Sequence, residues 1–205
     1  RPFQILAHGF DVTRLQRPGV MRNLREIRIE HILPDLVADD GHIRDEGVRG
    51  LRVHFYYSLI DWWREDAPRG RTGLGTGRPA EKEDADAYFD FMKAQLTELL
   101  TQYGDVGAIW FDGIWDQDEN PGFDWRLGEL YGLIHKLQPG CLIINNHHLA
   151  PFEGEDAQAF ERDLPGENTA GYSGQEISRL PLETCQTMNG MWGYKITDQN
   201  YKSAQ

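Results

Sequence analysis

The stretch that decides the fold is Val106-Gly107-Ala108-Ile109-Trp110-Phe111-Asp112-Gly113, an apolar run that ends in an aspartate and a glycine. Its branched and aromatic side chains are typical of a strand buried on both faces. Asp112 follows the apolar run directly, and Gly113 leaves room for a ligand to approach the backbone. The pattern alone permits two interpretations of Asp112: a reactive carboxylate at the mouth of a sheet, or a strand-end aspartate that caps the next turn.

Two more strands and two helices are predicted around this run. The segments Leu51 to Tyr57 and Cys141 to Ile144 are further buried strands. Apolar residues at steps of three and four predict a helix over residues 88–103, stopped by a glycine. A second helix is predicted between Asp124, a suitable N-cap, and Pro139-Gly140. The order strand, helix, strand, helix, strand predicts parallel strands with right-handed crossovers.

Each predicted strand ends in polar residues, namely Tyr57-Ser58, Asp112 and Asn145-Asn146-His147-His148. In a (β/α)₈ barrel the chemistry lies at the carboxyl ends of the strands, and a doubly wound sheet follows a similar rule. No glycine-rich phosphate loop follows any predicted strand, which favours the barrel. A complete barrel takes about 250 residues. We therefore expect an α/β fold with a TIM-like (β/α)₈ barrel that is incomplete in this chain.

Charge and composition exclude several classes of function. The 205 residues carry a net charge of −12 with a pI of about 5.0, which argues against nucleic acid and anionic membrane surfaces as partners. No apolar run approaches the roughly 18 residues of a membrane helix, so we expect no membrane insertion. Residues 1–50 balance eight arginines against eight acidic residues, so the whole net charge lies on residues 51–205. Cys141 and Cys185 permit one disulfide, which the sequence does not decide.

Candidate binding residues cluster near the predicted strand ends. Aromatic rings can stack on the apolar faces of sugars or pack in the core, and for Trp110, inside a strand, packing is the stronger interpretation. His147 and His148 are neighbours on a strand, so their side chains point to opposite faces and are not expected to share a metal ion. No Walker loop, Cys-x-x-Cys or His-Glu-x-x-His pattern occurs, and we expect no cofactor and no metal. The aromatic candidates are Trp110, Trp115, Trp125, Trp192 and Tyr194.

An acidic stretch after the third strand offers partners for Asp112. Most of these carboxylates must be solvated, because charged side chains rarely bury unpaired. One of them can act as a general acid, and Glu183 is a further candidate, so composition leaves the partner open. The stretch contains Glu153, Glu155, Asp156, Glu161, Asp163 and Glu167.

Four motifs in order resemble glycoside hydrolase family 29, the α-L-fucosidases. Residues 53–62, Val-His-Phe-Tyr-Tyr-Ser-Leu-Ile-Asp-Trp, resemble a strand-and-loop motif of the family, and residues 109–113 resemble its nucleophile motif. Residues 142–146 resemble the next strand, and residues 182–194 resemble a late block of the family. The resemblance covers roughly Gly50 to Ser203. It implies that residues 51–205 are a partial catalytic barrel domain, and that residues 1–50 are a divergent or truncated segment.

The resemblance implies a retaining mechanism in which Asp112 attacks C1 of an α-L-fucosyl group. It favours Glu161, five residues after Asp156, as the acid/base over Glu183, which then is structural or supports the site. Retention needs two carboxylates about 5–5.5 Å apart. Four residues are expected to bind the sugar: Tyr57, Trp62, His147 and Trp192.

The family implies a fucosylated glycan as substrate and a secreted or periplasmic location. Family members also carry a His-His pair on an early strand and a C-terminal β-sandwich. Residues 7–11, Ala-His-Gly-Phe-Asp, match the early motif poorly, and no β-sandwich follows. We therefore expect a fragment that lacks the early strands. The alternative to an active fucosidase is an inactive fragment or a sugar-binding remnant.

Overall fold

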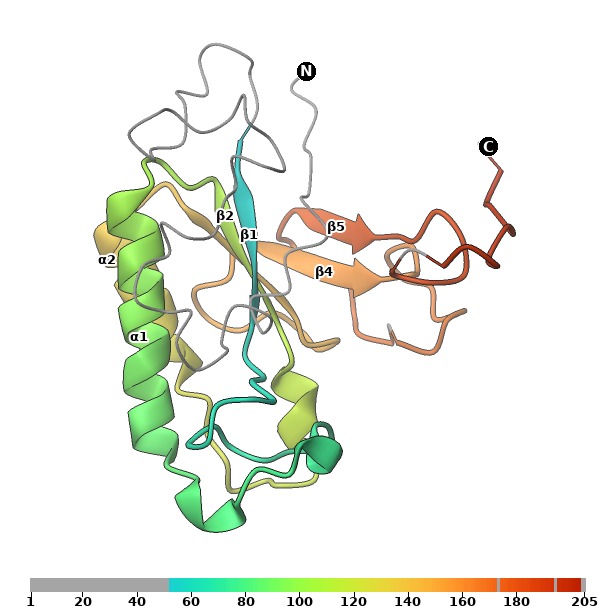
Figure 1. The fold of residues 1–205 in the computed structure, drawn as a ribbon. Helices are drawn as coiled ribbons and strands as arrows, with labels where there is room; N and C mark the ends of the chain where they lie inside the picture. The colour runs from blue at the N-terminus through green and yellow to red at the C-terminus, as the bar shows by residue number, and fades with distance from the viewer. Residues whose placement is uncertain (1–51, 173, 194, 204–205) are drawn as a thin grey trace.

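A computed structural model describes residues 52–203 apart from residues 173 and 194. The chain forms one five-stranded sheet in which every neighbouring pair is parallel and the spatial order follows the chain order (Figure 1). In a doubly wound sheet the order of the strands reverses at a switch point, and no such reversal occurs among these five strands. The expectations placed on residues 1–50 lie outside the described residues. The strands are β1 (His54–Ser58), β2 (Ala108–Asp112), β3 (Leu142–Asn146), β4 (Ala157–Glu161) and β5 (Leu182–Cys185).

Two helices cover one face of the sheet and form the first two crossovers. Helix α1 (Ala85–Gln102) connects β1 to β2, and α2 (Leu127–Leu137) connects β2 to β3. Both lie side by side along the same face (Figure 1). The predicted alternation of three strands with two helices and the parallel pairing are thus confirmed. None of the helices within the described residues is both long and apolar enough to cross a bilayer.

The start of α2 differs from the prediction. Asp124 is not the N-cap, because the helix begins at Leu127 after Arg126, whose backbone is left-handed with φ 51°. The Asp124 carboxylate instead accepts a hydrogen bond from the Arg126 amide at 2.7 Å. The Arg126 guanidinium pairs with Glu129 and with Asp86 of α1, which joins the two helix starts.

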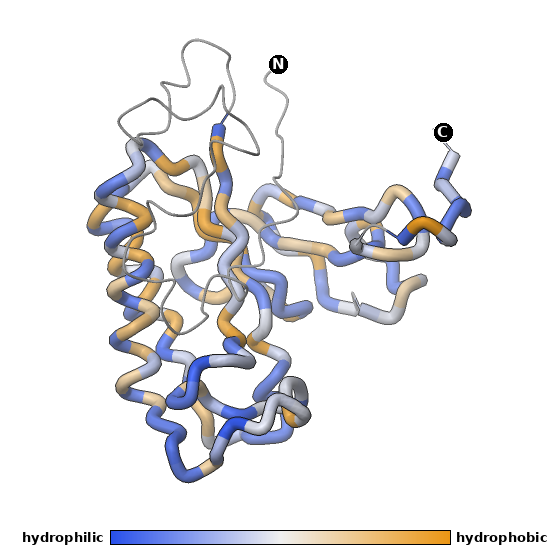
Figure 2. The backbone as a smooth tube through the Cα atoms, viewed as in Figure 1, coloured by the Kyte–Doolittle hydropathy of each residue, from blue (hydrophilic) through white to orange (hydrophobic). Residues whose placement is uncertain are grey.

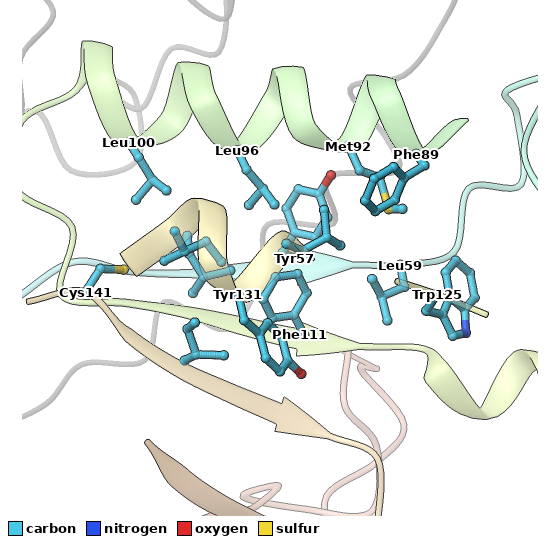
Figure 3. Close-up of a cluster of buried hydrophobic side chains, with 14 of the residues drawn as sticks. Tyr57, Leu59, Phe89, Met92, Leu96, Leu100, Phe111, Trp125, Tyr131 and Cys141 are labelled. Carbon is cyan, nitrogen blue, oxygen red and sulfur yellow. The ribbon is translucent and has the colours of Figure 1, made fainter. Parts of the chain in front are cut away.

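The main core lies between the helices and the sheet, where alternate strand residues point (Figure 3). The Phe111 ring packs edge-on against Tyr57 at 5.4 Å between centroids, and against Tyr131 of α2 at 5.6 Å. Met92 and Leu96 cover them from α1. Figure 2 shows the same pattern along α1, where apolar segments alternate with polar ones.

A smaller cluster lies on the opposite face of the sheet. It is built from Trp110, Ile144, Cys185 and the alanines of β2 and β4, with Tyr56 packed against it. Cys141 belongs to the main core instead, so the two cysteines occupy opposite faces, and both are free and buried.

The last two strands were not predicted. The acidic stretch was expected to be a largely solvated loop, but its centre, Ala157–Glu161, is the buried strand β4. Alanine and glutamine are poor strand formers, so neither propensity nor alternation marked this segment. Among the described residues, no helix lies between β3 and β4 or between β4 and β5, and the described connections are loops. Glu161 therefore stands at the carboxyl end of a strand.

Candidate active site

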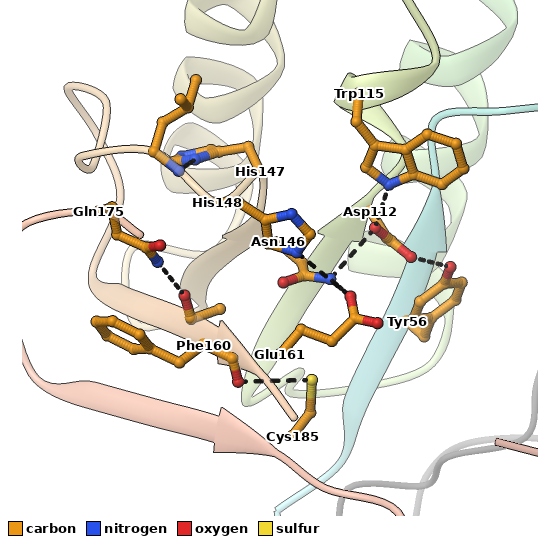
Figure 4. Close-up of polar contacts among 12 residues, drawn as sticks. Tyr56, Asp112, Trp115, Asn146, His147, His148, Phe160, Glu161, Gln175 and Cys185 are labelled. Carbon is orange, nitrogen blue, oxygen red and sulfur yellow. Dashed lines mark hydrogen bonds and ion pairs between the residues drawn. The ribbon is translucent and has the colours of Figure 1, made fainter. Parts of the chain in front are cut away.

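The parallel register brings the carboxyl ends of the strands to one edge of the sheet. Ser58, Asp112 and Asn146 are direct partners across β1, β2 and β3. Four consecutive strands each direct one polar side chain to the same place, on the face opposite the helices (Figure 4). These four residues are Tyr56, Asp112, Asn146 and Glu161, and we call them the carboxylate cluster.

Three donors hold the Asp112 carboxylate. The Tyr56 hydroxyl donates to Oδ2 at 2.7 Å, and the Trp115 indole Nε1 donates to Oδ1 at 3.2 Å. The Asn146 amide nitrogen lies 3.5 Å from the same Oδ1. Burial raises the pKa of Asp112 above its usual range despite the first two hydrogen bonds, and the charge of Glu161 adds to the rise.

Glu161 is held in the same way at the end of β4. Its Oε2 accepts a hydrogen bond from the Asn146 amide at 2.7 Å and lies 3.3 Å from His148 Nε2. Trp192 donates a further hydrogen bond to this carboxylate. Burial alone would raise the pKa of Glu161, but the hydrogen bonds from His148, Asn146 and Trp192 outweigh it and lower the pKa.

A single amide nitrogen therefore bridges the two carboxylates. Asn146 Nδ2 is 3.5 Å from Asp112 Oδ1 and 2.7 Å from Glu161 Oε2. The two oxygens can be no farther apart than these distances combined, so the two carboxylates are neighbours at the strand ends. The geometry accommodates two carboxylates acting on one atom between them.

The opposite pKa shifts predict opposite effects on stability. When folding raises the pKa of a carboxyl group, that group lowers the free energy of unfolding at high pH. The loss begins as the pH rises above the unfolded pKa, about 3.9 for aspartate, and is complete above the folded pKa. Asp112→Asn is therefore expected to raise Tm at pH 7 but not at pH 3. Each 1 kcal/mol corresponds to about 2–4 °C in Tm for a domain of this size.

Glu161→Gln provides the contrast. Because folding lowers the pKa of Glu161, its ionised carboxylate stabilises the folded protein at pH values above the unfolded pKa. This stabilisation is lost as the pH falls through the folded pKa. Glu161→Gln is therefore expected to lower Tm at pH 7. Thermal denaturation of both variants at pH 7 and pH 3 checks the pair, and shifts of the same sign at pH 7 would contradict it.

Two of the predicted sugar-binding residues lie on the wrong face of their strands. Tyr57 is only 2% exposed and points to the helices, where its hydroxyl donates to Gln95 at 2.8 Å. His147 is buried against Glu155, with Nε2 3.0 Å from its carboxylate. Strand side chains alternate between faces, so Tyr56, the neighbour of Tyr57, reaches Asp112. Beyond the end of β3 it is His148, the neighbour of His147, that reaches Glu161.

The remaining predicted residues are close to the cluster or deeper beneath it. Trp192 is 49% exposed and contacts Glu161. Glu183 lies on β5 two residues before Cys185, the partner of Glu161, and accepts a hydrogen bond from Trp110 Nε1 at 2.9 Å. Burial raises the pKa of Glu183. Trp62 lies in the loop after β1, 42% exposed.

Tyr56, Asn146 and His148 were not predicted as site residues. The strand register identifies Tyr56. Ser58 pairs with Asp112, and side chains two residues apart on a strand lie on the same face, so Tyr56 must lie on the same face as Asp112. His148 has a left-handed backbone with φ 61°, which strand alternation does not foresee.

Comparison with known proteins identifies a family. The family model for α-L-fucosidase matches residues 37–205, beginning ahead of the Gly50 boundary of the resemblance. The chain belongs to the α-L-fucosidase family, whose members are glycoside hydrolases. Alpha-L-fucosidase 1 of Arabidopsis thaliana is 36% identical over 112 residues, which are 55% of this chain and 19% of that protein.

Two solved structures share the fold. Alpha-L-fucosidase isoenzyme 1 from Paenibacillus thiaminolyticus has a TM-score of 0.58 and 34% identity, over 77% of this chain and 39% of that chain. The α-L-fucosidase from Vibrio sp. strain EJY3 has a TM-score of 0.60 and 29% identity, over 77% of this chain and 27% of that chain. The matched part thus spans less than half the length of each of these three relatives.

Proposed function

We propose that this chain supplies both catalytic carboxylates of a retaining exo-α-L-fucosidase, and that its sheet is part of a (β/α)₈ barrel. The observation that carries the proposal is the Asn146 amide shared by Asp112 and Glu161. Five parallel strands in chain order, with the cluster at their carboxyl ends, support the barrel.

In this mechanism a terminal α-L-fucosyl group binds with C1 beside Asp112. The Asp112 carboxylate attacks C1 while the C1–O bond breaks, and Glu161 gives its proton to the leaving oxygen. Glu161 then takes a proton from water as the water attacks C1 of the glycosyl-enzyme, and Asp112 is released. Tyr56 and Trp115 keep the Asp112 carboxylate oriented through the two steps.

The pKa directions of the free site run against this distribution of the proton. Burial favours protonated Asp112, and hydrogen bonds favour ionised Glu161, whereas the first step needs the reverse. The two carboxyl groups share one amide donor. The roles are therefore assigned from the strand-end positions and the motif around Asp112, and chemical rescue separates them.

The alternative function is a sugar-binding remnant without turnover. It is favoured by the pKa directions of the free site, which place the proton on Asp112 rather than on Glu161. The same carboxylate cluster would then bind fucose hydroxyls without cleaving a bond.

The test is the anomeric form of the first product. Proton NMR during hydrolysis of an aryl α-L-fucoside is expected to show α-L-fucose first, because two displacements at C1 restore its configuration. Initial β-L-fucose would overturn retention. If no fucose is released, calorimetry with L-fucose distinguishes a binding remnant, which gives heat, from an inactive fragment, which does not.

A further inference from the structure

The loop after β1 is fastened to the turn that follows Asp112. This turn is the short helix η7 (Ile114–Gln117), and its Asp116 side chain is almost completely buried. Asp116 Oδ1 accepts hydrogen bonds from the Thr72 amide at 2.8 Å and the Thr72 hydroxyl at 2.7 Å. The Asp116 carbonyl accepts from the Arg71 amide at 2.9 Å. The loop and η7 are therefore held as one unit.

The same unit borders the Asp112 carboxylate. Trp115 of η7 donates its indole hydrogen bond to Asp112 Oδ1. On the other side, the amide of Leu59, at the start of the loop, donates to the Asp112 carbonyl at 2.8 Å. A Cβ on Gly113 would lie 2.7 Å from the Ile60 side chain, so the loop passes directly against the residue after Asp112.

Two neighbouring tryptophans of this loop are exposed, Trp62 and Trp63, and Trp62 is the one whose indole is hydrogen-bonded to the fastened threonine. Its Nε1 donates to the Thr72 hydroxyl at 3.0 Å, so the indole is oriented by the same threonine that binds Asp116. The ring edge packs against Gly73, where a Cβ would lie 2.5 Å from Trp62 Cδ1. The ring is thus fixed in place while 42% of the residue stays open to solvent. A fixed, exposed indole offers a flat apolar surface at little cost in entropy.

Two arginines on either side of Gly70 in the loop are paired with carboxylates. Arg69 pairs with Glu83 at 2.9 Å, and Arg71 pairs with Asp118 at 3.3 Å. The charges of these two guanidinium groups are therefore offset. A neutral sugar ring, with an apolar face and hydroxyls at its edge, suits this surface.

We propose that Trp62 is the stacking platform of a leaving-group subsite that binds the neutral pyranose to which the fucose is attached. This inference rests on the proposed function, because the leaving group exists only if Asp112 and Glu161 cleave a fucosyl bond. The fastening through Thr72 and Asp116 sets the platform at a fixed distance from Asp112.

Kinetics with two kinds of leaving group test the platform. α-L-Fucosyl fluoride has no sugar ring to stack, whereas 2′-fucosyllactose and 3-fucosyllactose do. Trp62→Ala is expected to lower kcat/KM on the fucosyllactoses about tenfold more than on the fluoride, the loss of one aromatic stacking contact. Trp62→Phe is expected to restore most of the difference. An equal loss on both kinds of substrate would overturn the subsite.

Alanine substitutions at two glycines of the loop form a matched pair that tests whether the contacts with Asp116 hold Trp62 in place. A Cβ on Gly70 would lie 2.1 Å from Asp116 Oδ2, whereas a Cβ on Gly75 meets nothing within 4 Å. Gly70→Ala is expected to reduce the preference for fucosyllactoses as Trp62→Ala does, and Gly75→Ala to keep the wild-type ratio. An unchanged ratio in Gly70→Ala would show that the loop does not set the platform.

Binding of lactose, the free leaving group, separates failure of the subsite from failure of the proposed function. Lactose is expected to change the tryptophan fluorescence of the wild-type chain and to bind Trp62→Ala at least about threefold more weakly. If fucosyl fluoride is not hydrolysed, the proposed function fails, and this titration still decides the subsite. Equal lactose binding by both chains, or none, would overturn it.

Discussion

Asp112→Gly is expected to abolish fucose release from aryl α-L-fucosides, and sodium azide is expected to restore turnover with β-L-fucosyl azide as the product. Loss of a catalytic nucleophile costs on the order of 10⁴-fold or more in kcat. The glycine leaves a space beside C1, lined by the donors Tyr56 and Trp115 that now hold the Asp112 carboxylate. A small anion can occupy this space and attack C1 from the same side.

The anomer of the azide product distinguishes the two roles. Azide in place of the nucleophile gives the β-azide in one displacement. Azide in place of the general base intercepts the glycosyl-enzyme and gives the α-azide after two. An α-azide from Asp112→Gly would therefore exchange the roles of Asp112 and Glu161. Asp105→Gly, an exposed aspartate before the start of β2, is the control and is expected to retain wild-type activity.

The loss of activity in Glu161→Gln is expected to depend on how much the leaving group needs a proton. The loss is expected to reach roughly 10²–10⁴-fold on fucosides with poor leaving groups, which need protonation as the bond breaks. Dinitrophenyl fucoside, whose leaving group needs no proton, is expected to lose much less in the first step. Plots of log kcat/KM against the pKa of the leaving group measure this difference as a steeper slope for the variant.

Glu183→Gln is the matched comparison. Glu183 accepts the indole hydrogen bond of Trp110 beneath the cluster and shares no donor with Asp112 among the described contacts. Its substitution is expected to change rates equally for all leaving groups. A steep slope for Glu183→Gln with a flat one for Glu161→Gln would make Glu183 the acid.

The sequence predicted the part of the fold that periodicity and strand propensity encode. Three apolar runs and two helical patterns were sufficient for β1, β2 and β3 and for the helices between them. The β4 strand was missed because Ala157 and Gln158 carry no strand signal, and its burial comes from pairing with β3 and β5. Long-range pairing of this kind is not written in a local pattern.

At two positions the side chain that contacts a carboxylate belongs to the neighbour of the residue chosen from the sequence. Tyr57 was chosen where Tyr56 contacts Asp112, because the period of two gives the faces of a strand only when the orientation of one of its residues is known. His147 was chosen where His148 contacts Glu161, and His148 lies beyond the end of β3 with a left-handed backbone, so this period does not apply to it. Asp112 was chosen from its strand-end position and from resemblance, and Glu161 from resemblance alone, and both carboxylates lie within reach of the Asn146 amide. Asn146 was recognised as polar, but its bridging contact depends on the register of β2 with β3.

The carboxylate cluster draws one side chain from each of four successive strands, and this has a consequence for how such proteins can diverge. Each group is fixed by the ladder and none by the length of a connecting loop. Insertions between strands can therefore accumulate during evolution without moving the reacting groups. A one-residue insertion inside a strand, by contrast, would turn its group to the helix side. Relatives are thus expected to vary in the loops that meet the leaving group while the spacing within each strand stays constant.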